Sequence, residues 1–184
     1  LDEPTSALAP PETARLLARY LMGPVARVYA WIDRSPVGNG IPQRVVGLDA
    51  PATVMFQFKA PRRYGVLDVA HTPDMIIESD YYADDNRVEV IGDRGILFVN
   101  RCTARTVDLP ELMMFRDGQT TAIPVEGVEW HDSFVACTRH LLEAIQTGAP
   151  PVLDGATGKE VLQFSLAALA SAREGREVRP EEVA

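Results

Sequence analysis

The sequence has little cysteine and no long apolar run, and each shortage excludes a class of protein. Only two cysteines occur in 184 residues, Cys102 and Cys137, without a CxxC pair or a histidine at zinc-ligand spacing, so we expect two free thiols. No apolar run approaches the ~20 residues of a membrane helix. The first residues also lack the basic-then-apolar order of a signal peptide. We therefore expect a soluble, cytoplasmic protein without a membrane partner.

Basic residues are also scarce. The chain has 18 Lys and Arg against 26 Asp and Glu, which gives a formal net charge of -8. Proteins that bind nucleic acids need a basic face to meet the phosphates. The few basic residues here are scattered along the chain, so a nucleic-acid partner is not expected.

A phosphate-binding loop is missing as well, and this decides the meaning of the first eight residues. LDEPTSAL (1–8) resembles the end of the Walker B strand of ATP-binding-cassette ATPases. A Walker B carboxylate works beside a G-x-x-x-x-G-K-[ST] loop, because the metal that it reaches is held by the nucleotide. The nearest string, GATGKE (155–160), has its glycines too close together and Glu after the Lys. The sequence therefore argues against an ATPase.

Hydrophobic residues make up 46% of the chain, which is enough for a real core, and their spacing predicts the elements. Residues 1–11 hold three prolines and are expected to form an arm or linker, and residues 12–184 a single α+β domain. A helix is predicted from residue 12 to the stop at Gly23 and Pro24. Strands are predicted over 25–33, 53–60, 64–71, 75–80, 86–92 and 95–100, followed by a hairpin over 112–125 around Asp117-Gly118.

Two amphipathic helices are predicted at the C-terminal end. The first, within 131–148, has Asp132 or Ser133 as N-cap and Gly148 after its end. The second lies between Asp154 and Gly175. The expected apolar faces are Phe134, Thr138, Leu141 and Ile145 in the first helix, and Leu162, Leu166 and Leu169 in the second. The fold class is therefore α+β, with a largely antiparallel sheet that helices cover on one face, leaving the other face for a partner.

Three strings carry a resemblance to a known family. They are LLARYLMGPVARVYAWI (16–32), SDYYADDNRVEVIGDRGILFVNRCT (79–103) and WHDSFVACTRHLLEAIQTGAPPVLDGATGKEVLQFSLAALASAREGREV (130–178), of which the last ends in the pattern S...gr.v. In this order they resemble the C-terminal domain of the Gfo/Idh/MocA family of NAD(P)-dependent oxidoreductases, which includes glucose-fructose oxidoreductase and inositol dehydrogenase. The resemblance covers about residues 13–180 and implies a fold like the C-terminal domain of glyceraldehyde-3-phosphate dehydrogenase.

The resemblance also implies what such a domain does. Family members place a nucleotide-binding Rossmann domain first, and the second domain supplies much of the substrate pocket and a dimer interface on its open sheet. This sequence contains no strand-G-x-G-x-x-G-helix unit, and the family's E-K-P segment with its active-site lysine is absent. The chain alone is therefore expected to bind no cofactor and to transfer no hydride. NAD or NADP is expected for a full-length parent, with a small-molecule substrate, a homodimer and possibly a separate Rossmann domain as partners.

One departure from the family pattern concerns proton transfer. The resemblance places a catalytic His and Asp at two positions of the first helix that hold Thr13 and Leu16 here. Neither side chain acts as a general acid or base near neutral pH. The catalytic residues of this chain are therefore unknown from sequence.

Five residues are candidates for binding a substrate. His71 and Asp74 share the turn HTPD, where imidazole and carboxylate could form an acid-base or metal-binding pair, although a solvated turn is the simpler explanation. Tyr81 and Tyr82 could line a sugar pocket by stacking and hydroxyl hydrogen bonds, or pack in a core or interface. Arg101 could bind a carboxylate or phosphate with two hydrogen bonds, or form an ordinary ion pair.

No metal site is predicted. Asp80, Asp84 and Asp85 form an acidic cluster, but its spacing is not that of an EF-hand and a solvated turn explains it. Trp130 before a helix is interpreted as a packing residue, and His140 in mid-helix as structural.

The sequence leaves three functions open. The first is the substrate-binding and oligomerisation domain of an NAD(P)-dependent dehydrogenase acting on a small polyol, sugar or related hydroxy compound. The second is a standalone, non-catalytic binding or assembly module, for which the absence of the catalytic His and Asp is the motive. The third is a cofactor-independent enzyme centred on His71 and Asp74.

Overall fold

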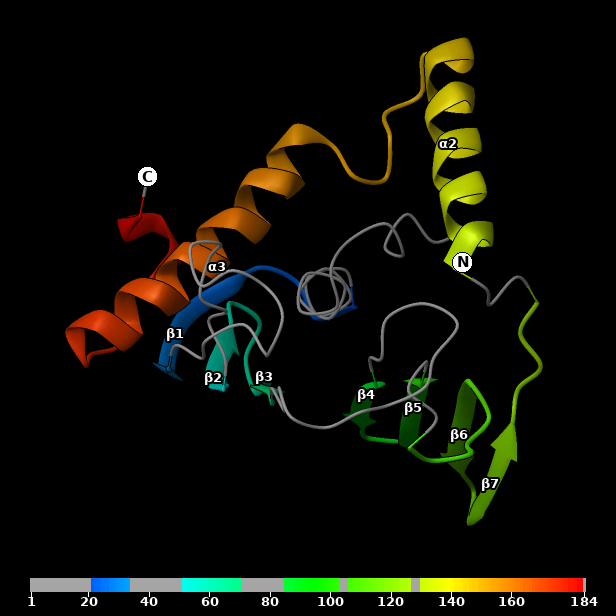
Figure 1. Ribbon diagram of the computed structural model, residues 1–184, viewed down its shortest axis with the longest axis horizontal. Coiled ribbons are helices and arrows are strands. Elements are labelled where there is room, and N and C mark those ends of the chain that lie inside the picture. The colour runs from blue at the N-terminus through cyan, green and yellow to red at the C-terminus, as the bar shows by residue number, and fades with distance from the viewer. Residues whose placement is uncertain (1–20, 34–50, 71–84, 103–105, 127–129, 184) are drawn as a thin grey trace, which may run out of the picture. The chain divides into compact units, whose positions relative to one another are not determined.

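The computed structural model describes residues 21–33, 51–70, 85–102, 106–126 and 130–183. These form an α+β arrangement of antiparallel sheets and helices (Figure 1). The elements in chain order are β1 (Val25–Ile32), β2 (Ala52–Phe58), β3 (Tyr64–Val69), β4 (Asp85–Gly92), β5 (Gly95–Cys102), β6 (Leu112–Arg116), β7 (Gln119–Ala122), α2 (Trp130–Thr147), α3 (Gly155–Glu174) and the 3-10 helix η2 (Pro180–Glu182).

The described strands pair in two sheets, where the sequence led us to expect one. One sheet has the order β1-β2-β3 and the other β4-β5-β6-β7. They belong to two compact units. The predicted strand over 75–80 lies outside the described residues.

The three-stranded sheet is an antiparallel meander with one buried and one exposed face. Along β2 the buried residues alternate with more exposed ones, and Val54 pairs with Ala30 of β1 and Leu67 of β3. Side chains of a strand point alternately to opposite faces, so every second residue meets the core. This confirms the strands that were predicted here, with boundaries shifted by one or two residues.

Helix α3 covers the buried face, and it does so with a different side from the one predicted. Leu162 and Leu169 of the predicted face are 57% and 41% exposed. The buried positions recur at helical spacing and are Phe164, Ala167, Ala168, Ala170 and Ser171. The small residues let the helix backbone approach the sheet closely, so the small face packs inward. Leu162 and Leu169 face outward, whereas Leu166, the third residue of the predicted face, is half-buried.

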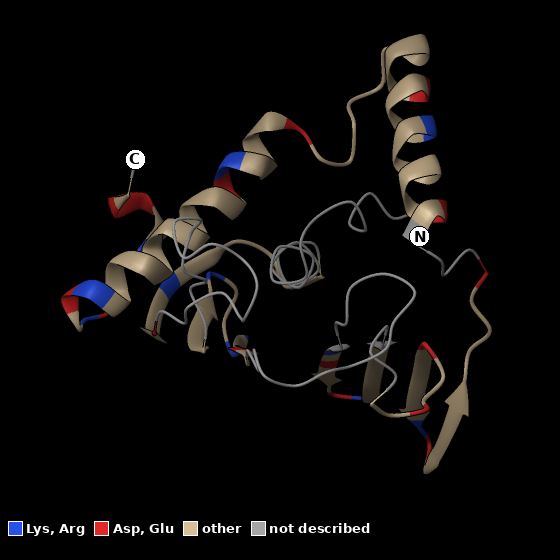
Figure 2. Ribbon diagram, viewed as in Figure 1, with Lys and Arg blue, Asp and Glu red and all other residues tan. Residues whose placement is uncertain are grey.

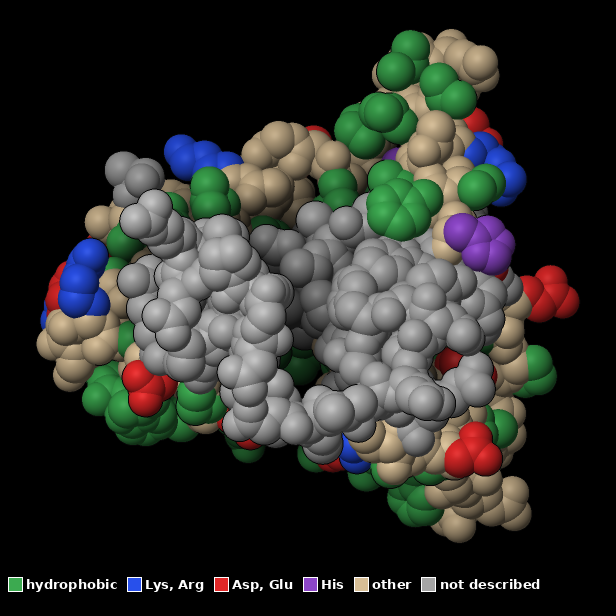
Figure 3. All heavy atoms as spheres, in the orientation of Figure 1, with side chains coloured by type: hydrophobic (Ala, Val, Ile, Leu, Met, Phe, Trp, Pro, Cys, Tyr) green, Lys and Arg blue, Asp and Glu red, His purple; other side chains and the backbone are tan. Residues whose placement is uncertain are grey.

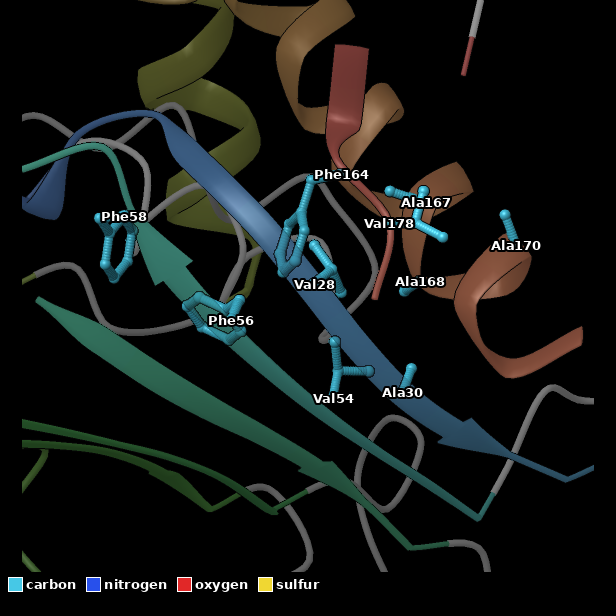
Figure 4. Close-up of a cluster of buried hydrophobic side chains, with 10 residues drawn as sticks. All are labelled: Val28, Ala30, Val54, Phe56, Phe58, Phe164, Ala167, Ala168, Ala170 and Val178. Atoms are coloured by element: carbon cyan, nitrogen blue, oxygen red, sulfur yellow. The ribbon is translucent and has the colours of Figure 1, made fainter. Parts of the chain in front are cut away.

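Phe164 fills the space that the small residues leave (Figure 4). The centroid of its ring lies 5.0 Å from that of Phe56 in an edge-on arrangement. The rings of Phe56 and Phe58 are also edge-on, with 5.4 Å between their centroids. Aromatic pairs of this geometry add about 0.5–1.5 kcal/mol beyond the burial of area. A Cβ at Gly65 would lie only 2.6 Å from the Cε2 and Cζ atoms of the Phe56 ring, which is too close for a real contact. The core therefore requires glycine at that point of β3.

The end of α3 and the residues after it form a strap along β1. Gly175 ends the helix in the left-handed conformation, with φ of 65°, and donates its N–H to the carbonyl of Ser171. Val178 then exchanges two backbone hydrogen bonds of 2.9 Å with Val28 of β1. The strap therefore occupies the β1 edge of the three-stranded sheet at Val28.

Charged residues of α3 lie only at its two ends (Figure 2). Lys159 and Glu160 stand near its start, Arg173 and Glu174 at its end, and none lies between them. At the start, Asp154 accepts a hydrogen bond of 2.7 Å from the Thr157 N–H, which confirms the predicted N-cap. This hydrogen bond from Thr157 lowers the pKa of Asp154.

The four-stranded sheet is a meander of hairpins. The β4–β5 pair runs from Asp85 opposite Cys102 to Gly92 opposite Gly95. Strands β6 and β7 form the hairpin predicted around Asp117-Gly118, whose φ values of 52° and 79° are both positive. Asn-Gly and Asp-Gly turns of this kind match the twist of two antiparallel strands.

Helix α2 begins at Trp130, so the prediction of Asp132 or Ser133 as its N-cap is wrong, and Asp132 lies in the first turn. Its end is as predicted, with Gly148 at a φ of 70°. Hydrophobic side chains of α2 lie on the surface (Figure 3). Phe134, Leu141 and Ile145 of the predicted face are 48%, 53% and 70% exposed.

Among the described residues, no helix is both long and apolar enough to cross a membrane.

Candidate functional site

Four of the five predicted site residues lie outside the described residues. These are His71, Asp74, Tyr81 and Tyr82. Arg101 lies in β5, where its backbone is opposite Asn86 of β4. The roles suggested for all five stay predictions. Of the acidic cluster, only Asp85 falls in a described strand.

The residue next to Arg101 is buried and polar, and the sequence did not reveal it. Asn100 is 6% exposed. Its side-chain amide donates to the carbonyl of Pro110 at 2.9 Å, and its backbone N–H donates to the carbonyl of Glu111 at 2.7 Å. Asn100 therefore fixes the segment before β6 to the end of β5, directly beside Arg101. A lone Asn in an apolar strand was the available signal.

A shallow hollow lies between the start of β1, α3 and η2. It is lined by Pro24, Val25, Lys59, Glu160, Val161, Gln163, Phe164, Pro180 and Glu181. Lys59 Nζ and Glu181 form an ion pair of 2.8 Å at its rim, and Gln163 donates to the carbonyl of Val183 at 3.2 Å. These polar groups therefore hold the C-terminal strap.

Among the described residues, the titratable groups at the C-terminal end whose pKa is shifted belong to ion pairs with a structural role. The side-chain hydrogen bond from Lys59 lowers the pKa of Glu181, and that from Arg176 lowers the pKa of Glu182. The hydrogen bond with Glu182 in turn raises the pKa of Arg176. Each of these shifts favours the charged form, so within the described residues they identify no group poised to exchange a proton near neutral pH.

The exposed face of the three-stranded sheet is apolar at its centre. We call this face the outer face. It is formed by Arg27, Tyr29 and Trp31 of β1, Thr53, Met55 and Gln57 of β2, and Tyr64, Val66 and Asp68 of β3. Its middle row pairs Tyr29, Met55 and Val66 across the three strands. Trp31 is 56% exposed and Val66 62%.

Polar groups of the outer face are paired with one another at its ends. Arg27 donates from Nε to Gln57 at 2.6 Å and lies 3.4 Å from Glu177 of the strap. At the opposite end, Thr53 donates its hydroxyl to Asp68 at 2.7 Å. The result is an apolar centre with polar ends, which is the usual anatomy of a protein interface.

Within the part of the chain that the structure describes, no group of three or more His, Cys, Asp or Glu could hold a metal ion. Cys137 is a free thiol, as predicted, and the side chain of Cys102 lies outside the description.

The C-terminal pattern S...gr.v has a structural explanation. Ser171 is fully buried; its hydroxyl accepts a hydrogen bond from the Ala30 N–H at 3.0 Å and donates one to the carbonyl of Arg176 at 2.6 Å. Gly175 supplies the left-handed turn, and Val178 pairs with β1. This string therefore locks α3 and the strap onto β1, a structural role that the sequence pattern alone did not reveal.

Comparison with known proteins finds oxidoreductases among the proteins that this chain resembles. No family model matches it. Over 168 residues, or 91% of the chain, it is 29% identical to the myo-inositol 2-dehydrogenase of Thermotoga maritima, of which the match covers 46%.

Solved structures of oxidoreductases share its fold. An oxidoreductase from Agrobacterium radiobacter, in complex with NAD+, L-tartaric acid and magnesium, matches with a TM-score of 0.68 at 18% identity, over 94% of this chain and 48% of that one. A probable dehydrogenase from Thermotoga maritima matches with a TM-score of 0.64 at 26% identity, over the same shares of 94% and 48%.

The chain thus spans about half the length of the relatives that it matches. The α+β arrangement corresponds to the C-terminal region of these proteins. Together, the sequence match to the myo-inositol dehydrogenase and the shared fold show that the chain is homologous to the Gfo/Idh/MocA oxidoreductases.

Proposed function

We propose that this chain is the substrate-binding and oligomerisation domain of an NAD(P)-dependent dehydrogenase, residues 12–184 forming the domain and residues 1–11 its arm. The match to about half of a myo-inositol 2-dehydrogenase is the observation that carries the proposal. The absence of a G-x-G-x-x-G unit from the sequence supports it, because the pyrophosphate of a dinucleotide needs such a loop at a helix N-terminus. The domain alone then transfers no hydride.

The proposed substrate is a small polyol, sugar or related hydroxy compound. One relative is a dehydrogenase of myo-inositol, and another holds L-tartaric acid in its crystal structure. Compounds of this class are bound through several hydroxyl groups. Tyrosine, histidine and arginine side chains such as those of Tyr81, His71 and Arg101 supply the matching donors and acceptors.

A calorimetric titration tests both halves of this proposal. We expect the purified chain to bind a member of a panel of polyols, aldoses and hydroxy acids and to bind neither NAD+ nor NADP+. The same mixtures, followed by the absorbance of the reduced nicotinamide, are expected to show no turnover. Nucleotide binding, or hydride transfer by the chain alone, would contradict the proposal.

Conservative variants connect the binding to the proposed residues. Y81F, Y82F and R101Q are each expected to lower the affinity for the bound compound by about 2- to 10-fold, which is the effect of one lost hydrogen bond. Y64F is the matched control, since Tyr64 is 78% exposed on the outer face of the three-stranded sheet. Unchanged affinity in all three variants would remove these residues from the site.

The second candidate is a non-catalytic binding or assembly module, which Thr13 and Leu16 favour because they stand where the family carries its proton-transfer residues. The coding sequence upstream of Leu1 separates the two. A strand-G-x-G-x-x-G-helix unit encoded there excludes the module, whereas a start codon at this point excludes the dehydrogenase domain. A cofactor-independent enzyme centred on His71 and Asp74 is a third possibility, and H71A with undiminished turnover would exclude it.

The oligomer that we propose is a homodimer that buries the outer face of the three-stranded sheet. Its centre consists of exposed apolar side chains, while Arg27 and Asp68 are held at its ends by partners within the chain. A two-fold axis places the same patch on both subunits, so an apolar centre meets an apolar centre. Burial of that centre supplies the driving force for association.

A further inference from the structure

The residues between α2 and α3 are held to α2 by a histidine. His140 lies in the second half of α2, and its Nε2 accepts a hydrogen bond of 3.0 Å from the backbone N–H of Val152. Val152 stands in the middle of the connection over 148–154, which we call the interhelix loop. The hydrogen bond thus reaches the loop at a point away from both helix ends.

Each end of the interhelix loop is fixed by groups that do not involve His140. At the α2 end, the Thr147 hydroxyl donates to the carbonyl of Glu143 at 2.7 Å and accepts from the Ala149 N–H at 3.3 Å. At the α3 end, Asp154 caps the helix through the Thr157 N–H at 2.7 Å. Loss of the His140 hydrogen bond would therefore release the middle of the loop while its ends stay capped.

The direction of this hydrogen bond makes it sensitive to protonation. Nε2 can accept only in the neutral imidazole, whose proton is then on Nδ1. The imidazolium carries a proton on both nitrogens, so a second donor would face the Val152 N–H. Histidine is the side chain whose charge ordinarily changes between pH 5 and 8.

The titratable groups nearest to this hydrogen bond along the chain lie on α2 and in the interhelix loop. On α2, Cys137 lies about one turn before His140, and Arg139 and Glu143 lie beside it and about one turn after it. In the interhelix loop, Asp154 is the charged residue, and it is engaged in the α3 cap. The hydrogen bond itself is formed by the imidazole and a backbone amide, and the amide does not titrate in this range.

We propose that His140 and Val152 form a pH-sensitive latch that fastens the interhelix loop to α2 when His140 is neutral and releases it when His140 is protonated. This inference rests on the geometry of the loop and is independent of the proposed dehydrogenase function. The latch sets how firmly the middle of the interhelix loop is held against His140 of α2.

Amide hydrogen exchange of the full chain, measured by NMR at pH 7 and pH 5 and corrected for the intrinsic rate, tests the latch. Protection of the Val152 amide is expected to fall by about tenfold or more between pH 7 and pH 5, the range over which histidine side chains change charge. The Gly175 amide, which donates to the Ser171 carbonyl at 2.8 Å, is the internal control and is expected to show no such step.

Two variants distinguish the latch from a general loosening of the structure at low pH. H140Q keeps an acceptor that does not titrate, so the pH step at Val152 should disappear. H140L has no acceptor, so protection should be low at both pH values. A pH step of the same size in H140L, or Val152 protection in the wild-type chain at pH 7 no greater than in H140L, would overturn the proposal.

The wild-type protein gives a further measurement if both variants fail to fold. The ¹⁵N shifts of the His140 ring report which nitrogen is protonated. We expect the proton on Nδ1 at neutral pH, and a proton on Nε2 would overturn the latch.

Discussion

Ser171 is the residue whose environment explains the most. Its hydroxyl satisfies both the Ala30 N–H of β1 and the Arg176 carbonyl of the strap, and the side chain has no exposed area. Because backbone polar groups left without partners in the interior are costly, S171A is expected to lower the free energy of unfolding by about 1–3 kcal/mol. Urea denaturation followed by circular dichroism measures this change.

S165A is the control for that substitution, since the Ser165 hydroxyl donates to the Val161 carbonyl one turn back within α3, where helical bonding persists without it. We expect a change well below that of S171A. Equal effects of the two substitutions would mean that the buried hydroxyl has no special role.

Helix α3 and its end hold two glycines that can be compared, one that needs a positive φ and one that does not. Gly175 has a φ of 65°, whereas Gly158 lies within the helix and has open space around the position of a Cβ. Since the left-handed conformation costs an L-residue about 1–2 kcal/mol, G175A should destabilise the fold by about that amount.

G158A should instead raise the free energy of unfolding by about 0.5–1 kcal/mol, because alanine loses less conformational freedom than glycine in a helix. The pair is measured by thermal and urea denaturation on the same preparation. If G175A is as stable as the wild type, the left-handed end of α3 is not the feature that holds the strap in place.

At the scale of the whole molecule, the outer face predicts the oligomeric state. V66D introduces a charge at the centre of the apolar face and is expected to convert the proposed dimer to monomers at micromolar concentration, because an unpaired charge cannot be buried there. Light scattering after size-exclusion chromatography measures the mass.

The matched control is I91D in β4, where Ile91 is 68% exposed, close to the 62% of Val66, but lies in the other sheet. The dimer should persist in this variant. A monomeric wild-type chain at micromolar concentration, or equal dissociation by both variants, would exclude the outer face as the interface.

The local elements were predictable from sequence because their signals are local. The turn at Asp117-Gly118, the cap at Asp154 and the ends at Gly148 and Gly175 each follow from conformations or hydrogen bonds that one residue type supplies. The strands over β1, β2 and β5 followed from β-branched and aromatic runs. The resemblance carried by three strings was enough to indicate the family.

Other features were decided only by the tertiary structure, because they depend on which surfaces meet. Periodicity showed that α3 has an apolar stripe at Leu162 and Leu169, but its small face at Ala167 and Ala168 is what a sheet can approach closely. Likewise, Ser171 is paired with Ala30 of β1, which is distant in sequence, and Asn100 with the segment before β6. Sequence by itself thus determined most of the described elements and the family resemblance, whereas only packing determined which faces are buried, since contact energy depends on the shape of both partners.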